Sequence, residues 1–411
     1  MNTMKTIKLG IMGALRGTAF AHTIQFVKNV ELVAVCEKNP NNMKKIAPYL
    51  NESTKVFENF DDFIHCGMDG VILCNYFHEH APYAIKAFEA GVAVLSETTA
   101  AISLGECVDL VEAAEKYNGR YMLAANCPYF KAVHAMKMRI QSGKSGRVMY
   151  AEAEYNHGSS REDKENAVQQ KGLHIDYDNL HWRQCMPANY YNMHTLGPLM
   201  YVTDSEPVKV CAKTIGFSDF ARLGGNVRDH DGSVVLTQMD NGALFNTSGC
   251  NGYAPSSKWY RIACENETME TERYEWREEK LLVTKDEAFV EVSYPNDYEE
   301  SGLITPEDDF TPADAAAAGH GGIDFHIVYH FVKYLRGKEE PFFNVYRSAR
   351  LSAVAILGWY SILSGRELDV PDFRIPEERD RVRNDYRTPI AKKYSDLQLP
   401  CRVEDRDKFN L

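Results

Sequence analysis

Residues 9–22 read LGIMGALRGTAFAH, and this stretch decides the fold of the first part of the chain. The stretch begins in an apolar strand and continues as a helical pattern. Gly10, Gly13 and Gly17 lie where the strand gives way to the helix. Glycine lets the backbone turn tightly, and the free N–H groups at the start of a helix attract phosphate. This order predicts a dinucleotide-binding turn, although the GxxGxxxG spacing departs from GxGxxG and also suits a turn without a ligand. The cofactor-binding residues expected here are Gly10, Met12, Gly13, Leu15, Arg16 and Gly17.

Glu37 ends the second apolar strand, 20 residues after Gly17. A carboxylate at this point can accept hydrogen bonds from the ribose hydroxyls of an adenosine. It also repels a 2′-phosphate, which favours NAD over NADP, while Lys38 beside it could attract that phosphate. The strand, the glycines, the helix and the acidic residue together predict NAD as the cofactor.

The order of strand and helix patterns predicts two domains and a tail. The first part alternates apolar strands with helical stretches such as 103–117, which is typical of an α/β Rossmann domain with a doubly wound parallel sheet. After a helix around 130–141, strand-like alternation predicts an α+β domain with a large, mainly antiparallel open sheet. The expected parts are an NAD-binding domain at 1–128, a substrate and oligomerisation domain at 129–373 and a C-terminal extension at 374–411.

The composition limits the class of protein. The chain has 411 residues, with 46 Lys and Arg against 58 Asp and Glu, which gives a net charge of −12. This charge opposes nucleic-acid binding, which depends on basic residues that neutralise phosphates. No apolar run reaches the ~18 residues of a membrane span, and the N-terminus does not have the regions of a signal peptide. The ten cysteines form no CxxC pair, so we expect reduced thiols and a cytoplasmic location.

Two clusters invite a metal interpretation, and neither supports it. His78, Glu79 and His80 are adjacent, so their side chains diverge at the start of a helix. The second cluster does not match the spacing of any known set of metal ligands, and a polar loop is the simpler interpretation. Its members are His174, Asp176, Asp178 and His181. We therefore expect no metal, and the lack of a GxSxG motif gives no support to a serine hydrolase.

Beyond the glycine turn, two segments resemble the glucose–fructose oxidoreductase/inositol dehydrogenase (Gfo/Idh/MocA) superfamily. They are CNYFHEHAPYAIKAFEAGVAVLSE (74–97) and AANCPYF (124–130). The resemblance extends to about residue 373 and implies an NAD-dependent enzyme that acts on a carbohydrate. It also implies cofactor contacts for residues that follow strands four to six: Asn75, His80, Glu97, Thr98 and Asn126.

One departure from the superfamily pattern narrows the resemblance. The usual Glu-Lys-Pro after the fifth strand, whose lysine supports proton transfer, reads Glu97-Thr98-Thr99 here. The chain is also similar to NAD-dependent glycosidases typified by α-N-acetylgalactosaminidase, a branch that lacks this lysine. The matching segments are ANCPYF (125–130), HWR (181–183), NYYNMHTLGP (189–198), GHGGIDF (319–325) and LDVPDF (368–373).

This narrower similarity implies roles for individual residues. Tyr191 and His194 match the catalytic tyrosine and histidine of the family, and Tyr129 matches a tyrosine that contacts the substrate. At positions i and i+3 of a helix, Tyr191 and His194 share a face, and an imidazole titrates near neutral pH. Such a pair can also simply pack and hydrogen-bond. The other implied contacts are Trp182 and Arg183 near the nicotinamide, and His181 and His320 near the substrate.

The resemblance leaves three functions open. The first is redox-neutral glycoside cleavage, in which transient C3 oxidation acidifies C2–H, the C1 substituent is eliminated and water adds. The second is a net NAD-dependent sugar or glycoside 3-dehydrogenase, and the third is a non-catalytic dinucleotide-binding sensor. The expected partners are a small-molecule sugar or glycoside and a second copy of the chain. The copy would form a homodimer or homotetramer, because an open sheet leaves an apolar face to be covered.

Overall fold

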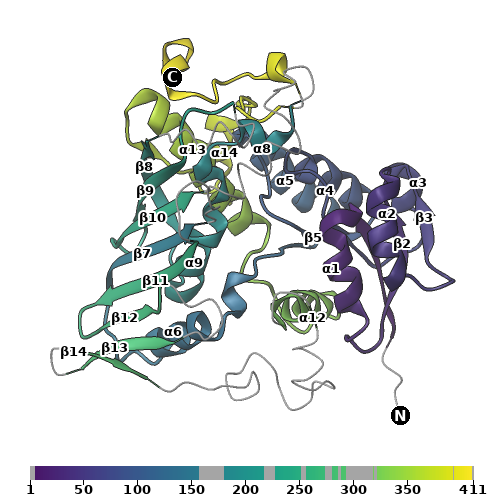
Figure 1. The fold of residues 1–411 in the computed structure, drawn as a ribbon, viewed down its shortest axis with the longest axis horizontal. Coiled ribbons are helices and arrows are strands. Elements are labelled where there is room, and N and C mark those ends of the chain that lie inside the picture. The colour runs from purple at the N-terminus through teal and green to yellow at the C-terminus, as the bar shows by residue number, and fades with distance from the viewer. Residues whose placement is uncertain are drawn as a thin grey trace, which may run out of the picture. The chain divides into compact units, whose positions relative to one another are not determined.

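The computed structural model describes residues 5–156, 180–216, 227–250, 256–273, 280–285, 288–292, 318, 322–391 and 393–409. The chain forms two compact units (Figure 1). Unit 1 consists of Met1–Ala101, Glu106–Tyr129 and Asn296–Ala349. Unit 2 consists of Ile102–Gly105, Phe130–Pro295 and Arg350–Leu411.

Unit 1 is built on a six-stranded parallel sheet. Its strands follow the spatial order β3-β2-β1-β4-β5-β6, and every neighbouring pair is parallel. The order reverses between β1 and β4, which creates the crevice at which doubly wound sheets bind nucleotides. The predicted Rossmann sheet is therefore confirmed. The strands are β1 (Ile7–Met12), β2 (Val30–Cys36), β3 (Lys55–Phe57), β4 (Gly70–Leu73), β5 (Ala93–Ser96) and β6 (Tyr121–Leu123).

Apolar strands and helices form the core of unit 1. β4 and β5 are buried along their whole length, as expected for central strands of a sheet with helices on both faces. Phe20, Phe325 and Phe331 are fully buried in the same core as Leu9 and Ile11 of β1. Helix α12 thereby packs against α1, although the two are far apart in the sequence. The helices are α1 (Ala14–Ile24), α2 (Pro40–Ile46), α3 (Phe60–Ile64), α4 (His80–Glu89), α5 (Leu104–Tyr117) and α12 (Ile323–Leu335), with short 3₁₀ turns η1 (Ala47–Tyr49), η2 (Phe77–Glu79) and η3 (Cys127–Tyr129).

Unit 2 is built on a nine-stranded sheet in the order β14-β13-β12-β11-β7-β10-β9-β8-β15. Among these described strands β7 and β10 pair in parallel, and the other neighbours are antiparallel. The predicted large, mainly antiparallel sheet is confirmed. The strands are β7 (Val148–Asn156), β8 (Pro207–Ile215), β9 (Gly232–Met239), β10 (Leu244–Cys250), β11 (Ser257–Cys264), β12 (Thr268–Thr271), β13 (Leu281–Lys285), β14 (Ala288–Glu291) and β15 (Leu368–Asp369).

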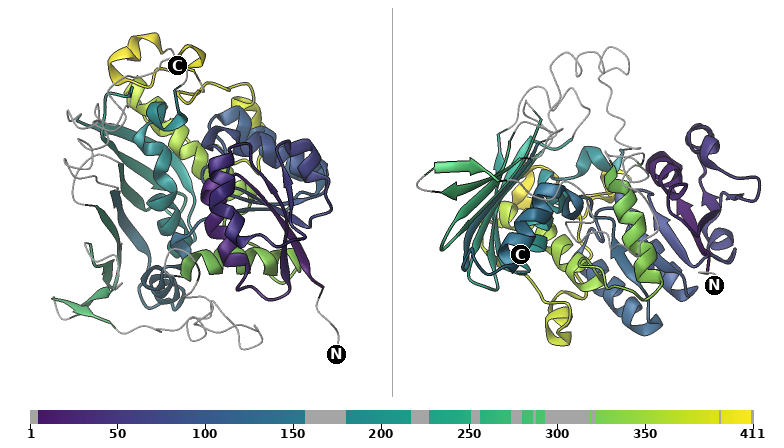
Figure 2. Two further views of the ribbon diagram at one scale, coloured as in Figure 1. Left: turned by 45° about the vertical axis from the view of Figure 1, so that its right-hand side comes forward. Right: turned by 90° about the horizontal axis from the view of Figure 1, so that it is seen from below.

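Helices cover one face of this sheet (Figure 2). On β11, Tyr260 and Ile262 alternate with the half-buried Trp259 and Arg261 and point into the core. Helix α9 is apolar on nearly all sides and packs against β7, β11 and α6. The helical elements are α6 (Lys131–Gln141), α8 (Trp182–Cys185), η4 (Ala188–His194), α9 (Leu196–Thr203), α13 (Val345–Ser364), α14 (Pro376–Val382), η6 (Tyr394–Asp396) and η7 (Val403–Lys408). No helix in the described ranges is both long and apolar enough to cross a membrane.

Candidate active site

The glycine turn after β1 has the geometry of a phosphate-binding turn. Gly13 has φ 88°, and a Cβ at this position would lie 2.6 Å from the carbonyl of Cys74. A side chain is therefore excluded both by the backbone conformation and by the close approach of the next strand. A Cβ at Gly17 would lie 2.5 Å from Cγ2 of Ile11, so this glycine lets α1 pack closely on β1.

The start of α1 attracts negatively charged groups, and one of them is the carboxylate of Glu37. Gly13 caps the helix without a side-chain hydrogen bond, and the first turn contains no acidic residue. Glu37 accepts the backbone N–H of Ala14 at 2.8 Å, which holds its carboxylate at the start of the helix. On the other side of the β1–β4 crevice, the buried Oδ1 of Asn75 has no hydrogen-bond partner among the described residues. These features fit the pyrophosphate and ribose of a dinucleotide.

Arg16 connects two carboxylates beside this turn. Its Nε donates to Glu97 at 2.6 Å, and its two terminal nitrogens donate to Asp324 at 2.9 and 2.8 Å. Burial acts to lower the pKa of Arg16, but Glu97 and Asp324 outweigh it and raise the pKa above the usual value. Asp324 is fully buried in the first turn of α12. Sequence reasoning missed this residue, because no motif links it to a helix more than 300 positions earlier.

The segment after β5 holds His80 in a defined state. The Nδ1 of His80 lies 2.8 Å from the carbonyl of Thr99, so the ring proton is assigned to Nδ1. Burial lowers the pKa of His80, and the hydrogen bond to Thr99 opposes this shift only in part. Thr98, at the position of the superfamily's lysine, donates its backbone N–H to Glu97 at 3.2 Å and has no titratable group.

Tyr129 belongs to a stack of rings within unit 1. Its ring lies 5.0 Å from that of His330 and 5.9 Å from that of His326, both nearly parallel to it. The Nδ1 of His330 in turn contacts Glu339 at 2.7 Å. Asn126 lies one turn before, where its carbonyl accepts the N–H of Tyr129. The two histidines of α12 were not predicted, although their i, i+4 spacing puts them on one helix face.

Tyr191 and His194 lie together on the short helix η4 of unit 2. Their rings are parallel, with an interplanar angle of 2° and centroids 4.6 Å apart. The 3₁₀ segment is kinked at Tyr191, which has φ −91° and ψ 24°, so the two rings meet across this kink and not on the face of one regular helix. His194 is buried, whereas Tyr191 is half-buried.

Two further tyrosines surround this pair. The ring of Tyr155 on β7 lies 4.4 Å from His194 and 6.2 Å from Tyr191. The buried hydroxyl of Tyr260 on β11 donates to the backbone carbonyl of His194 at 3.0 Å. Strand periodicity alone did not single out Tyr155, because half-buried tyrosines are common on sheets. The arrangement presents a phenol and an imidazole side by side.

The HWR segment forms the four-residue helix α8 of unit 2. His181 caps it, because its Nδ1 accepts the N–H of Arg183 and its backbone N–H donates to Gln184. The guanidinium of Arg183 lies 4.4 Å over the ring of Trp182, which is buried. His320 and residues 174–178 lie outside the described residues.

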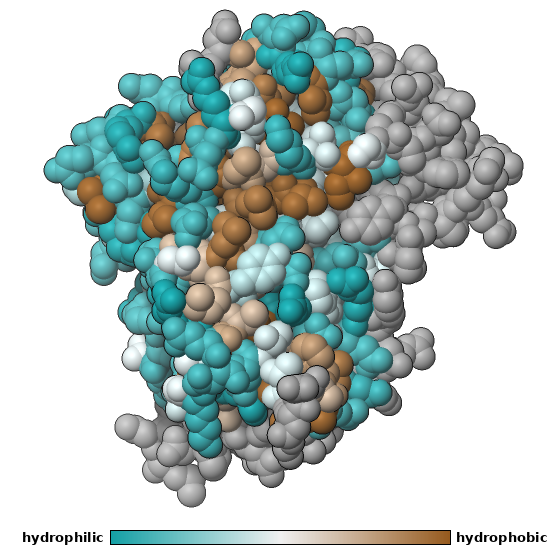
Figure 3. All heavy atoms as spheres, turned by 90° about the vertical axis from the view of Figure 1, so that its left-hand side faces the viewer, coloured by the Kyte–Doolittle hydropathy of each residue, from teal (hydrophilic) through white to brown (hydrophobic). Residues whose placement is uncertain are grey.

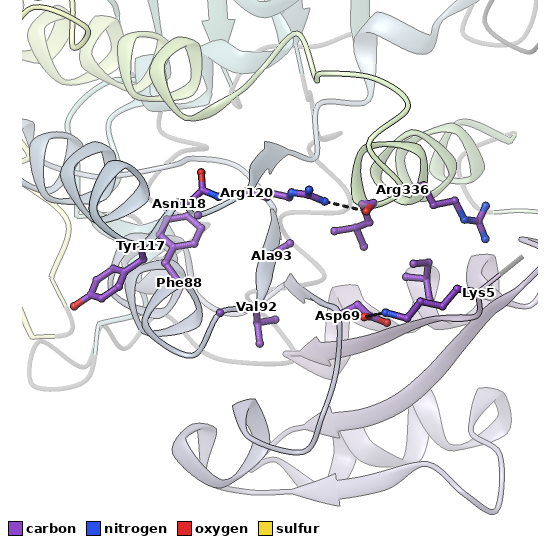
Figure 4. Close-up of a pocket in the computed structure, with 13 residues that line it drawn as sticks. Lys5, Asp69, Phe88, Val92, Ala93, Tyr117, Asn118, Arg120 and Arg336 are labelled. Atoms are coloured by element: carbon purple, nitrogen blue, oxygen red, sulfur yellow. Dashed lines mark hydrogen bonds and ion pairs between the residues drawn. The ribbon is translucent and has the colours of Figure 1, made fainter.

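A separate cavity of about 440 Å³ lies at the opposite edge of the unit 1 sheet (Figure 4). Its lining includes the first residues of two strands, Ile7 of β1 and Ala93 of β5. Two contacts across its wall are the ion pair of Lys5 with Asp69 at 2.8 Å and the bond from Arg120 to the carbonyl of Leu335 at 2.9 Å. Dinucleotides bind beyond the carboxyl ends of such strands, so this cavity is not the cofactor site.

Two family models match parts of the chain. Residues 7–125 match the model of the oxidoreductase family with an NAD-binding Rossmann fold. This match likens the N-terminal part of the chain to the Gfo/Idh/MocA oxidoreductases. Residues 310–377 match the C-terminal domain of glycosyl hydrolase family 109. The predicted family and the NAD cofactor are confirmed, and the chain is an NAD-dependent enzyme of the Gfo/Idh/MocA type.

Individual relatives span nearly the whole chain of this Gfo/Idh/MocA protein. A glycosyl hydrolase family 109 protein of Stenotrophomonas maltophilia is 25% identical, covering 90% of this chain and 89% of its own. An α-N-acetylgalactosaminidase of Shewanella oneidensis is 24% identical, covering 90% and 85%. A solved levoglucosan dehydrogenase in complex with NADH and L-sorbose has a TM-score of 0.71 at 19% identity, covering 90% and 100%, and supports the fold.

Proposed function

We propose that this Gfo/Idh/MocA enzyme acts on a carbohydrate and cleaves a glycoside without net oxidation. The observation that carries the proposal is the parallel pair of Tyr191 and His194 on η4, with Tyr155 against it. The names of the family 109 relatives support glycosides as the substrate class. Thr98 in place of the superfamily's lysine supports proton transfer by other side chains.

The proposed chemistry assigns a separate proton to each member of the pair. NAD⁺, which Gly13, Glu37 and Asn75 would help to hold, supplies a hydride acceptor for C3 of the sugar and returns the hydride at the end of the cycle. His194 takes the proton of the C3 hydroxyl, since an imidazole is a base near neutral pH. Tyr191, in its phenolate form, removes the C2 proton that the C3 ketone has acidified, and the C1 substituent then leaves with the electron pair of its bond. Water adds to the unsaturated sugar.

Other predicted contacts enter the proposal as binding groups. We assign Tyr129 and His181 to the substrate, together with His320. Trp182 and Arg183 would contact the nicotinamide, and Arg183 is exposed enough to reach a ligand.

The test follows two products at once. The purified enzyme is given NAD⁺ and a panel of nitrophenyl α- and β-glycosides, and nitrophenol and NADH absorbance are recorded together. We expect each enzyme molecule to release many molecules of nitrophenol while no NADH accumulates. NADH formed in step with oxidised sugar would instead establish a net dehydrogenase, and silence in both channels at saturating NAD⁺ would favour the sensor.

We also propose that the open face of the unit 2 sheet binds a second copy of the chain. Two neighbouring strands carry exposed apolar side chains there, Leu236 on β9 and Leu244 on β10, which their pairing register places on one face. Apolar residues gather in the middle of this side of the molecule and polar residues surround them (Figure 3). Sedimentation should give a dimer or tetramer that Leu236→Lys weakens. Val56→Lys, which changes a similarly exposed apolar residue on β3, is the matched control and should leave the assembly intact.

A further inference from the structure

The end of the chain is attached to unit 2 through residues 400–404. The indole N–H of Trp359 on α13 donates to the carbonyl of Pro400 at 2.9 Å. The backbone N–H groups of Val403 and Glu404 both donate to the carboxylate of Asp229, each at 2.9 Å. The apolar cluster beneath this segment consists of Leu180, Cys185, Val227 and Cys401.

Asp229 connects the tail to a buried histidine. The Nδ1 of His230 lies 3.3 Å from Oδ1 of Asp229, and the imidazole stacks on Trp359 with centroids 5.1 Å apart. The Nε2 of His230 accepts the backbone N–H of Ala188 at 3.3 Å. Because Nε2 accepts, the ring proton is assigned to Nδ1, which donates it to Asp229.

Burial, more than the surrounding charges, favours the neutral ring of His230. Burial lowers the pKa of His230, and Arg228 acts in the same direction, while Asp229 and Asp231 oppose it. Burial acts to raise the pKa of Asp229, but the bonds from His230 and from the two tail amides outweigh it and lower the pKa. A charged carboxylate beside a neutral imidazole fixes the tautomer in which Nε2 can accept from Ala188.

The backbone that His230 holds is the start of the segment with the proposed catalytic pair. Ala188 is the first residue of η4, which carries Tyr191 and His194. A short 3₁₀ helix has few internal hydrogen bonds, so contacts from outside determine its position. The side chains of Asn189 and Asn192 attach the same segment to carbonyls of α13, at 2.5 and 3.1 Å. The two asparagines therefore hold this backbone segment against α13, and His230 holds its first residue.

We propose that residues 400–404 position residues 188–194 for proton transfer through Asp229 and His230. The inference rests on the proposed function of Tyr191 and His194. His230 is a positioning residue, because it contacts the backbone of the catalytic segment and not the reacting groups. A displacement of about 1 Å can lower a rate about 100-fold, so a weakened contact at Ala188 is enough to be measured.

The test removes one hydrogen bond from the tail. Val403→Pro deletes the N–H that donates to Asp229 and leaves the carboxylate and the histidine in place. Proline is tolerated at the first residue of a helical turn, and the preceding Arg402 already has the extended conformation, φ −120° and ψ 139°, that proline requires. Val403→Ala is the matched control, because it shortens the side chain and keeps the N–H.

Val403→Pro is expected to lower kcat for the best nitrophenyl glycoside about ten-fold, with KM within about two-fold. Hydrogen exchange should accelerate in peptides that cover residues 186–195 and stay unchanged in α6. NADH affinity should stay close to that of the wild type, because the glycine turn of unit 1 is unchanged. Val403→Ala should match the wild type in every readout.

His230→Phe provides a second, independent variant. It keeps an aromatic ring against Trp359 and removes the acceptor for Ala188, so it should reproduce the kcat and exchange changes. Wild-type kcat and wild-type exchange in Val403→Pro would overturn the proposal, as would equal losses in Val403→Ala. If Val403→Pro fails to fold, His230→Phe decides whether His230 positions residues 188–194, and wild-type kcat and exchange in that variant would overturn the proposal. If the wild type turns over no glycoside, the proposed function fails, while exchange at residues 186–195 still decides the positioning.

Discussion

The pair of Arg16 and Asp324 offers the sharpest test of how α12 supports the cofactor turn. Asp324 is fully buried, and it accepts two hydrogen bonds from Arg16, whose side chain is 28% exposed. The substitution Asp324→Asn keeps the shape of the side chain. It removes the negative charge and turns an amide N–H toward one guanidinium N–H.

The expected cost follows from these contacts. A hydrogen bond to a charged group contributes about 1.5–3 kcal/mol, and the substitution loses one of the two bonds, since the amide oxygen still accepts the other. Arg16 also keeps its bond to Glu97 and part of its hydration. We therefore expect the free energy of unfolding to fall by about 2 kcal/mol. At a urea dependence of about 2 kcal/mol per molar, the midpoint drops by about 1 M.

A surface pair provides the matched control. Asp61 forms an ion pair with Lys86 at 2.7 Å, but both side chains are largely exposed. Asp61→Asn makes the same chemical change there, and exposed pairs contribute only about 0–1 kcal/mol. Urea unfolding is followed by circular dichroism for the whole chain and by tryptophan fluorescence for unit 2, which contains all four tryptophans. A midpoint for Asp324→Asn no lower than that for Asp61→Asn would refute the view that this buried pair stabilises unit 1.

Three more outcomes are expected. Tyr191→Phe should lower kcat about 10²- to 10⁴-fold, because it removes the proposed proton-transfer group. Tyr76→Phe changes an exposed phenol and should leave kcat unchanged. Equal kcat values for the two variants in stopped assays would contradict the role of Tyr191. Gly13→Ala should weaken NADH binding in a fluorescence titration more than Gly67→Ala, because both glycines have positive φ but only Gly13 faces a backbone carbonyl. Burial lowers the pKa of His80 in the folded chain, so the unfolded state binds its proton more tightly and stability falls as the pH drops below the unfolded value of about 6.5. Urea midpoints at pH 7.5 and 5.5 should therefore differ less in His80→Gln than in the wild type, and an unchanged difference would exclude His80 as a source of the loss.

The sequence predicted the fold of both units because its patterns are local. Strand periodicity, glycines and the acid at Glu37 each lie within one strand–turn–helix stretch, and the parallel and antiparallel sheets follow from how such stretches connect. The short helix α14 in the tail was missed, because charged residues occupy most of its sides and leave no apolar period. Hydrophobic patterning cannot reveal a helix that buries few apolar side chains.

The contacts that hold the site were harder to predict, because they join distant positions. Asp324 lies in the matched segment GHGGIDF, but nothing in that segment points to Arg16, and nothing in the sequence links Asp229 to Val403. The roles proposed for Tyr191 and His194 rest on their family match, since i, i+3 spacing alone does not separate a catalytic pair from a packed one. Partners of this kind become visible only when the chain is folded.

The missing lysine at Thr98 changes the charge of the cofactor edge as well as its chemistry. In the absence of this lysine, Glu97 forms an ion pair with Arg16. Arg16 also forms an ion pair with the buried Asp324. Glu37 adds a further negative charge at the start of α1, where it accepts the N–H of Ala14. The balance among these groups is negative, which suits a cofactor without a 2′-phosphate. It also leaves residue 98 without a side chain that accepts a proton, so the proposed function assigns proton transfer to Tyr191 and His194 instead.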